Sequence, residues 1–173
     1  KDMYENEVPQ HNVMLDSYYM GEVEVTQALW YAVMDVNPSS FQGESRPVEN
    51  VSWDDCQVFI KKLNELSGYK FSLPTEAQWE FAARNNGDYK YSGSDKVESV
   101  AFFDLAETKD VAQKKPNGFG LYDMSGNVWE WCSDWYAIYT DLDEENPTGP
   151  NSGESHVLRG GAWNDNARSC RVF

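Results

Sequence analysis

Two short stretches combine residue types that are costly to order, and they are the first candidates for chemistry. They are residues 126–131 (GNVWEW) and 159–163 (RGGAW). Glycine loses more backbone freedom on folding than any other residue, and a buried tryptophan needs a partner for its indole N–H. Such a turn is typical of a metal site or a ligand pocket, where the backbone must be fixed closely. A corner of an irregular fold is the alternative.

The three cysteines, Cys56, Cys132 and Cys170, could support other chemistry. At most one disulfide can form, so we predict no disulfide framework, and a Cys132–Cys170 pair is one possibility. As a nucleophile, Cys170 would need a base to form its thiolate, but neither His11 nor His156 is close in sequence. The alternative is that Cys170 is a small buried apolar residue.

The composition limits the partners of the chain. Its 173 residues carry a formal net charge of -15, which repels phosphate backbones and anionic membranes, so we expect no nucleic-acid partner. No apolar run approaches the roughly 20 residues that span a bilayer, so we predict no membrane insertion. Acidic loops suit Ca²⁺, although excess carboxylates also simply solvate a surface. Lys1 is not a native start, which leaves room for a removed leader.

Three helices are predicted from caps and apolar spacing. One opens at Thr26 and ends before Pro38, because the residue before proline avoids the helical region. A second runs from its cap at Ser52 to a stop at Gly68, with an apolar stripe at spacings of three and four. A third begins at the capping box of Thr75.

The rest of the chain predicts few strands and much loop. Residues 13–25 alternate loosely and predict one or two strands. Residues 85–115 and 136–155 show no period, and long ordered loops of this kind often carry binding sites. No internal repeat or linker is present. We therefore predict one domain over residues 1–173, of the α+β class.

Five motifs in chain order resemble those of the formylglycine-generating enzyme, or sulfatase-modifying factor, family. They are residues 19–26 (YMGEVEVT), 46–53 (RPVENVSW), 73–80 (LPTEAQWE), 117–131 (NGFGLYDMSGNVWEW) and 158–163 (LRGGAW). The resemblance implies a C-type lectin-like fold. It says less about activity, because one fold hosts many functions. The closing strand of the family would follow Phe173, so we expect the domain to lack it.

The same resemblance implies a copper site that this sequence does not complete. In the family, two cysteines hold Cu(I) for the oxidation of a sulfatase cysteine by O₂. The second matches Cys170, but the first matches Asp165, a hard ligand that holds Cu(I) poorly. The positioning serine matches Ala162, whereas the tryptophan beside the site is kept as Trp131. We therefore expect no copper and no oxidase activity. An oxidoreductase that uses Cys170 is the alternative.

The resemblance also implies a structural Ca²⁺ at the glycine–asparagine turn. Its ligands would be the carbonyls of Ser125, Gly126 and Val128 and the carboxylate of Glu130. Ca²⁺ takes six to eight oxygens, and the carbonyls of a tight turn converge well on it. The alternative is that Glu130 bonds the N–H groups of the turn, or pairs with an arginine. A second calcium site of the family matches residues 98–112, where we expect none.

Without the copper pair, the region after the last motif becomes a candidate binding surface. It offers one aromatic residue among polar side chains, as in loop-based binding sites: Trp163, Asn164, Asp165, Asn166, Arg168 and Ser169, with Trp131 nearby. This stretch is similar to the part that varies in the variable proteins of diversity-generating retroelements. The alternatives are that Asn and Asp bond their own backbone in turns, and that Arg168 pairs with an acidic residue.

We therefore predict a lectin-like module that binds a protein or a small polar ligand around residues 163–169. We expect it to work outside the cytoplasm, as an extracellular, cell-surface or periplasmic domain. An oxidoreductase of the sulfatase-maturation type and a structural scaffold subunit of a surface or secretion assembly are the alternatives.

Overall fold

The three predicted helices are confirmed. The computed structural model describes residues 7–173, so the predicted domain boundary at residue 1, and the interpretation of Lys1, lie outside the described residues. Helix α1 spans Gln27–Met34, α2 spans Trp53–Ser67 and α3 spans Glu76–Arg84.

Each helix begins at the cap that the sequence predicts. Thr26, Ser52 and Thr75 each accept a hydrogen bond from the backbone N–H three residues ahead, and the last two form full capping boxes. Helix α1 stops earlier than predicted. Asp35 adopts a left-handed conformation (φ 62°) and closes the helix at Met34, before the proline signal takes effect.

The strands are shorter than predicted. Only Val13–Met14 (β1) is a strand in the region 13–25, and it pairs in parallel with Glu144–Glu145 (β3). The central pair joins Glu130–Trp135 (β2) and His156–Arg159 (β4) in antiparallel register, with an irregularity between Trp131 and Trp135. Two 3₁₀ turns, Val97–Ser99 (η2) and Ala167–Cys170 (η3), complete the elements. Of the one or two strands predicted over residues 13–25, one forms, and it covers only two residues; the α+β class is confirmed.

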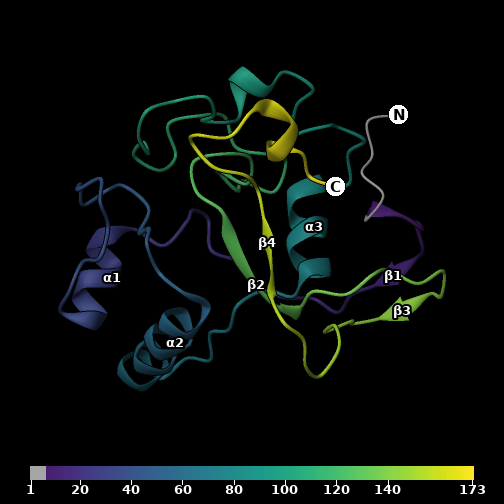
Figure 1. Ribbon diagram of the computed structural model, residues 1–173, viewed down its shortest axis with the longest axis horizontal. Coiled ribbons are helices and arrows are strands. Elements are labelled where there is room, and N and C mark those ends of the chain that lie inside the picture. The colour runs from purple at the N-terminus through teal and green to yellow at the C-terminus, as the bar shows by residue number, and fades with distance from the viewer. Residues whose placement is uncertain (1–6) are drawn as a thin grey trace.

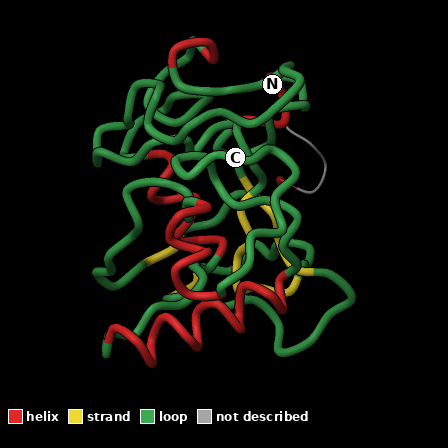
Figure 2. Tube along the Cα trace, turned by 90° about the vertical axis from the view of Figure 1, so that its left-hand side faces the viewer, coloured by secondary structure: helices red, strands yellow, loops and turns green. Residues whose placement is uncertain are grey.

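Loops and turns make up most of the trace (Figure 2). The β2–β4 pair runs through the centre with α3 beside it (Figure 1). Helices α1 and α2 lie together on one side, and the β1–β3 pair lies on the other. Among residues 7–173, no helix has both the length and the apolar character needed to cross a membrane.

The core is divided into three clusters rather than one. Helix α1 packs on α2 through Trp30 and Phe59, whose rings stack at a centroid distance of 4.8 Å. Trp79 of α3 is fully buried against the β2–β4 pair in the second cluster, together with Cys132. Cys170 belongs to the third cluster, under the loop that carries η2. Side chains of the loops therefore fill much of the interior.

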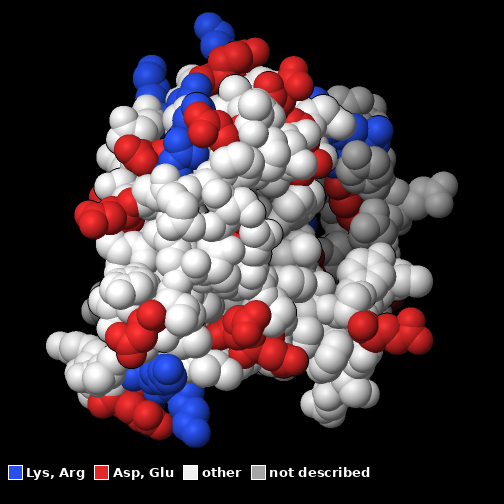
Figure 3. Space-filling view, turned by 60° about the vertical axis from the view of Figure 1, so that its left-hand side comes forward, with Lys and Arg blue, Asp and Glu red and all other residues white. Residues whose placement is uncertain are grey.

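The negative charge is not spread evenly over the surface. On the face in Figure 3, Asp and Glu side chains gather toward the margins, while a broad central area carries neither acidic nor basic residues.

The imidazole of His156 lies between the indoles of Trp53 and Trp135, at centroid distances of 3.9 and 3.7 Å. This stack joins the first residue of α2 to the end of the β2–β4 pair at which β2 stops and β4 begins.

The turn at Gly126 requires glycine for two reasons. Its φ is +85°, in the left-handed region, and a Cβ there would lie 2.3 Å from the carbonyl oxygen of Phe102. Gly126 donates to the carbonyl of Gly160 at 2.8 Å, and Asn127 donates to that of Phe102 at 2.8 Å. The turn is therefore clamped between two other segments of backbone.

We expect Gly126→Ala to lower the free energy of unfolding by more than about 3 kcal/mol, because the new methyl group meets fixed backbone. Gly68→Ala is the matched control. It has a similar φ of +74°, but a Cβ there meets nothing within 4 Å, so only the conformational cost of about 1 kcal/mol applies. Urea unfolding of both variants measures the difference. Equal losses of stability would contradict this account of the turn.

Candidate functional site

The glycine–asparagine turn is held by a carboxylate that sequence reasoning did not single out. Glu24 accepts from the Asn127 side-chain amide at 2.7 Å and from the Val128 N–H at 3.0 Å. The alternative in which Glu130 bonds the N–H groups of the turn is therefore wrong, because Glu24 makes these bonds. The available signal was the position of Glu24 inside the first of the five motifs.

Glu130 lies half-buried beside this turn, close to other carboxylates. Burial raises its pKa to about 7; the indole of Trp79 opposes this shift, and the charge of the nearby Asp123 adds to it. The pKa of Glu24 is also raised by burial and by these two carboxylates. Oδ1 of Asp123 is buried without a hydrogen-bond partner. The turn is therefore surrounded by carboxylates that no cation of the chain neutralises among the described residues.

The carbonyl groups of the turn fall into two classes. The carbonyl of Asn127 accepts from the Trp163 N–H at 2.8 Å. Among residues 7–173, the carbonyls of Gly126 and Val128 accept no hydrogen bond, while the carbonyl of Ser125 faces the Phe102 N–H across the parallel bridge between Phe102 and Gly126. In the same range, no three His, Cys, Asp or Glu side chains gather as a metal cluster. A cation here would therefore depend on backbone oxygens, and the three carbonyls and one carboxylate predicted from the sequence fit Ca²⁺ chemistry.

The backbone of the display segment, as we call residues 163–169, is pinned on both sides. Trp163 accepts from the Leu105 N–H at 2.7 Å, and Asp165 accepts from the Asp104 N–H at 2.9 Å. The Asp165 carboxylate accepts from the Ala162 N–H at 3.0 Å. These bonds fix the path of a segment with no regular secondary structure before η3.

The side chains of the display segment divide into structural and exposed ones. Trp163 is half-buried, with its ring edge-on to Phe41 at 5.1 Å. Asp165 holds the turn, and the Asn166 side chain caps η3 by accepting from the Arg168 N–H. For these two residues the turn alternative is therefore correct. The residues whose side chains are exposed are Asn164, Asn166 and Arg168, and Ser169 is half-buried.

Trp131 belongs to a different part of the molecule. Its indole donates to the carbonyl of Val51, just before α2, at 3.1 Å. No hydrogen bond or ring contact within residues 7–173 links Trp131 to the display segment. The structure thus groups Trp163–Ser169 and leaves Trp131 outside that group.

The three cysteines are free thiols, so the possible Cys132–Cys170 disulfide was wrong. Cys132 and Cys170 are fully buried in separate core clusters. Burial raises the pKa of Cys170 to about 12, with a contribution from the charge of Asp165. His156 is stacked between two indoles, and His11 contacts Tyr139, so neither serves as a base for Cys170. The alternative of a small buried residue describes Cys170.

These residues do not fit a two-thiolate Cu(I) site. The carboxylate at the first family position, Asp165, is engaged with the Ala162 N–H. The only matching thiol, Cys170, is fully buried, and its raised pKa disfavours the thiolate that copper needs.

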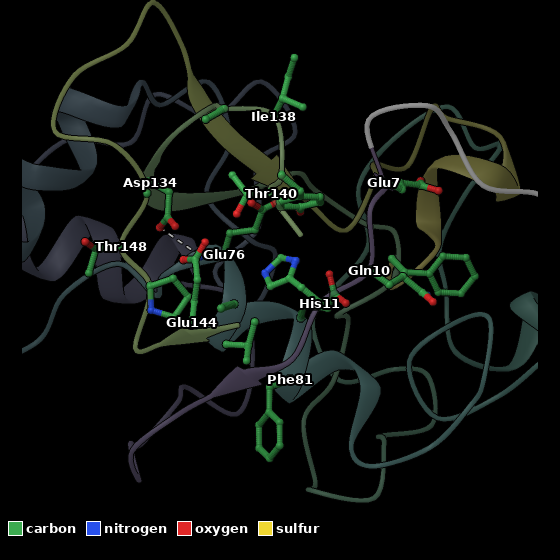
Figure 4. A pocket seen from close by; sticks show the side chains of 18 of the residues that line it. Glu7, Gln10, His11, Glu76, Phe81, Asp134, Ile138, Thr140, Glu144 and Thr148 are labelled. Atoms are coloured by element: carbon green, nitrogen blue, oxygen red, sulfur yellow. Dashed lines mark hydrogen bonds between the residues drawn. The ribbon is translucent and has the colours of Figure 1, made fainter. Parts of the chain in front are cut away.

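A cavity that was not predicted lies elsewhere. It has a volume of about 830 Å³ and is enclosed by the N-terminal segment before β1, α3, the end of β2 and residues 137–150. We call it the acidic cavity. Figure 4 shows its labelled side chains arranged around the opening: Glu7, Gln10, His11, Glu76, Phe81, Asp134, Ile138, Thr140, Glu144 and Thr148. No local pattern could have revealed it, because its walls come from widely separated parts of the sequence.

Comparison with known proteins agrees with the motifs. The whole chain, residues 1–173, matches the sulfatase-modifying factor enzyme 1-like domain family. It is 31% identical to the chaperone protein LppX of Paenibacillus barcinonensis over 93% of this chain and 74% of that protein. It is 33% identical to the formylglycine-generating enzyme of Streptomyces coelicolor over 69% of this chain, but spans only 42% of that enzyme.

Among solved structures, Treponema denticola variable protein 1 matches with a TM-score of 0.87 and 36% identity, over 94% of this chain and 79% of that one. This match confirms the resemblance to variable proteins and the lectin-like fold. The relatives carry different names and share one architecture, so the family does not by itself fix an activity. From the motifs, the fold and these matches together, the chain belongs to the sulfatase-modifying factor enzyme 1-like family.

Proposed function

We propose that this domain is a binding module, and that the display segment is its contact surface for a protein or a small polar ligand. The observation that carries the proposal is the contrast between a pinned backbone and exposed side chains. The bonds to Asp104, Leu105 and Asn127 hold the backbone, while Asn164, Asn166 and Arg168 face solvent. A rigid backbone that presents polar side chains loses little conformational entropy when a partner binds.

The likeness to Treponema denticola variable protein 1 supports this proposal, because the display segment is the stretch that the resemblance to variable proteins implies to be the varying part. The chemistry of the cysteines speaks against the oxidoreductase alternative. Cys170 is buried as a thiol of raised pKa, and Asp165 serves the turn. We therefore propose a domain that has no copper centre.

We also propose that it acts outside the cytoplasm, in the extracellular space, at the cell surface or in the periplasm. Fractionation of the producing cells tests this proposal.

A second proposal concerns the glycine–asparagine turn. We propose that Ser125, Gly126 and Val128, through their carbonyls, and Glu130, through its carboxylate, hold a structural Ca²⁺. The support is the pair of carbonyls without donors, at Gly126 and Val128, beside the Glu130 carboxylate of raised pKa. A bound cation would neutralise charge that the fold otherwise leaves uncompensated.

The binding proposal predicts that Asn164 and Arg168 can be replaced without loss of the fold. We expect the double variant Asn164→Ala/Arg168→Ala to melt within about 2 °C of the wild type, because surface changes cost little. Peptide and glycan arrays should yield partners of the wild type that bind this variant at least about tenfold more weakly. Asp165→Ala is the structural control, and we expect it to lower the melting temperature. Array partners that bind the double variant undiminished would refute the assigned surface, as a scaffold would predict.

The calcium proposal predicts a response to chelation. At a free Ca²⁺ concentration about 100 times the Kd, the bound ion adds about 2.7 kcal/mol. Chelation should then lower the melting temperature by roughly 5–10 °C in a domain of this size. Glu130→Gln is expected to abolish the response, while Glu154→Gln, on the exposed surface, should keep it. An unchanged melting temperature of the wild type in chelator would rule out the bound ion.

The thiol chemistry predicts slow modification. With iodoacetamide at pH 8, Cys132 and Cys170 should stay unlabelled in the folded protein, since both are buried and have raised pKa values. In urea all three cysteines should react, which provides the control. Mass spectrometry of tryptic peptides identifies the labelled positions. Rapid labelling of native Cys170 would support the oxidoreductase alternative instead.

A further inference from the structure

The acidic cavity has the dimensions of a ligand site. Its volume of about 830 Å³ falls within the range of about 300–1,000 Å³ typical of small-molecule pockets. Its walls include the aromatic side chains of Phe81, Trp135, Tyr139 and Phe173. None of residues 163–169 lines it, so the inference drawn from it is independent of the function proposed for the display segment.

The charges around the cavity do not balance. The acidic residues that line it are Glu7, Glu76, Glu80, Asp134 and Glu144, and the basic ones are Arg84 and Arg159. Both guanidinium groups are already paired with Glu80, at 2.9 and 2.6 Å, and Arg159 also lies 3.7 Å from Glu76. Glu7 forms an ion pair with Arg171. The walls therefore carry more negative charge than their own cations neutralise, and an anionic ligand is excluded by repulsion.

Two carboxylates carry the excess charge. Asp134 is buried and accepts from the Glu76 N–H at 3.0 Å and from the Ser133 hydroxyl at 2.9 Å. Glu144 lies on the short strand β3. No Lys or Arg of residues 7–173 forms an ion pair with either carboxylate. Burial also raises the pKa of Asp134 and of Glu76, although Arg159 opposes the shift at Glu76.

The cavity also offers a hydrogen-bond acceptor on His11. Nδ1 of His11 is buried without a hydrogen-bond partner. Its ring contacts that of Tyr139 at a centroid distance of 5.8 Å, and Figure 4 shows the imidazole among the cavity side chains. In its neutral form the imidazole can accept an N–H from a ligand through this nitrogen.

We propose that the acidic cavity binds an organic cation, an alkylammonium or guanidinium group on a short apolar stem. Asp134 and Glu144 would pair with the charge, and Nδ1 of His11 would accept one of its N–H groups. The rings of Phe81 and Trp135 would contact the stem and the face of the cation. A metal ion does not satisfy these walls, because within residues 7–173 no three ligating side chains converge on one point.

Isothermal titration calorimetry with the full chain tests the proposal at low ionic strength. The probes are cadaverine and agmatine as free amines, N-acetyl-lysine amide and N-acetyl-arginine amide as side chains of a polypeptide, and pentan-1-ol as a neutral comparator. Binding of the free amines alone identifies a small-molecule amine as the ligand. Tighter binding of the blocked amino acids identifies a basic side chain. Either result supports the proposal, whereas equal binding of pentan-1-ol, or no binding by any cation, overturns it.

Variants of the cavity carboxylates test whether Asp134 and Glu144 bind the cation. We expect Asp134→Asn and Glu144→Gln each to raise the Kd of the tightest cationic probe at least about tenfold. Asn at position 134 keeps an oxygen that accepts from the Glu76 N–H, and Glu144 joins β1 through backbone only, so both variants should fold. Circular dichroism melting checks this expectation. Glu154→Gln, on the exposed surface outside the cavity, should leave the Kd unchanged. Folded Asp134 and Glu144 variants with the wild-type Kd would overturn the proposal.

Discussion

The fold depends on one buried asparagine. Asn127 is fully buried, and its backbone and side chain together bond three segments that are far apart in sequence. Its N–H donates to Phe102, its carbonyl accepts from Trp163, and its side-chain amide bonds Lys109 on one side and Glu24 on the other. A buried amide must satisfy all of its donors and acceptors, so this residue permits only one arrangement of the loops around it.

The same principle explains how a protein with so little strand keeps a fixed shape. Asn117 bonds the carbonyl of Ala82 at 2.8 Å and the hydroxyl of Ser92 at 3.0 Å. Ser125 donates to the carbonyl of Cys170 at 2.8 Å and accepts from the Ser92 N–H. Side chains here satisfy backbone groups that a sheet would satisfy elsewhere. The long loops are therefore ordered by specific polar contacts, and function can be placed on them without loss of rigidity.

The sequence predicted the features that local chemistry controls. The caps at Thr26, Ser52 and Thr75 are decided within four residues, and all three helices begin there. The strands were harder, because β1 pairs with a segment about 130 residues away and its residues alternate no more clearly than their neighbours. The candidate site was predicted in part. The motif located the turn and the display segment, but the roles of Glu24 and Asp165, and the acidic cavity, depend on contacts between distant segments.

The span of the bonds made by Asn127 also sets an order of events during synthesis. Glu24 precedes it by 103 residues, and Trp163 follows it by 36. Helices with local caps can form as the chain emerges, but the centre cannot close until the last motif has been translated. Contacts of such long range slow folding and leave partly assembled loops exposed in the meantime. A ribosome-bound intermediate of this domain would therefore contain its helices but not yet the contacts around Asn127.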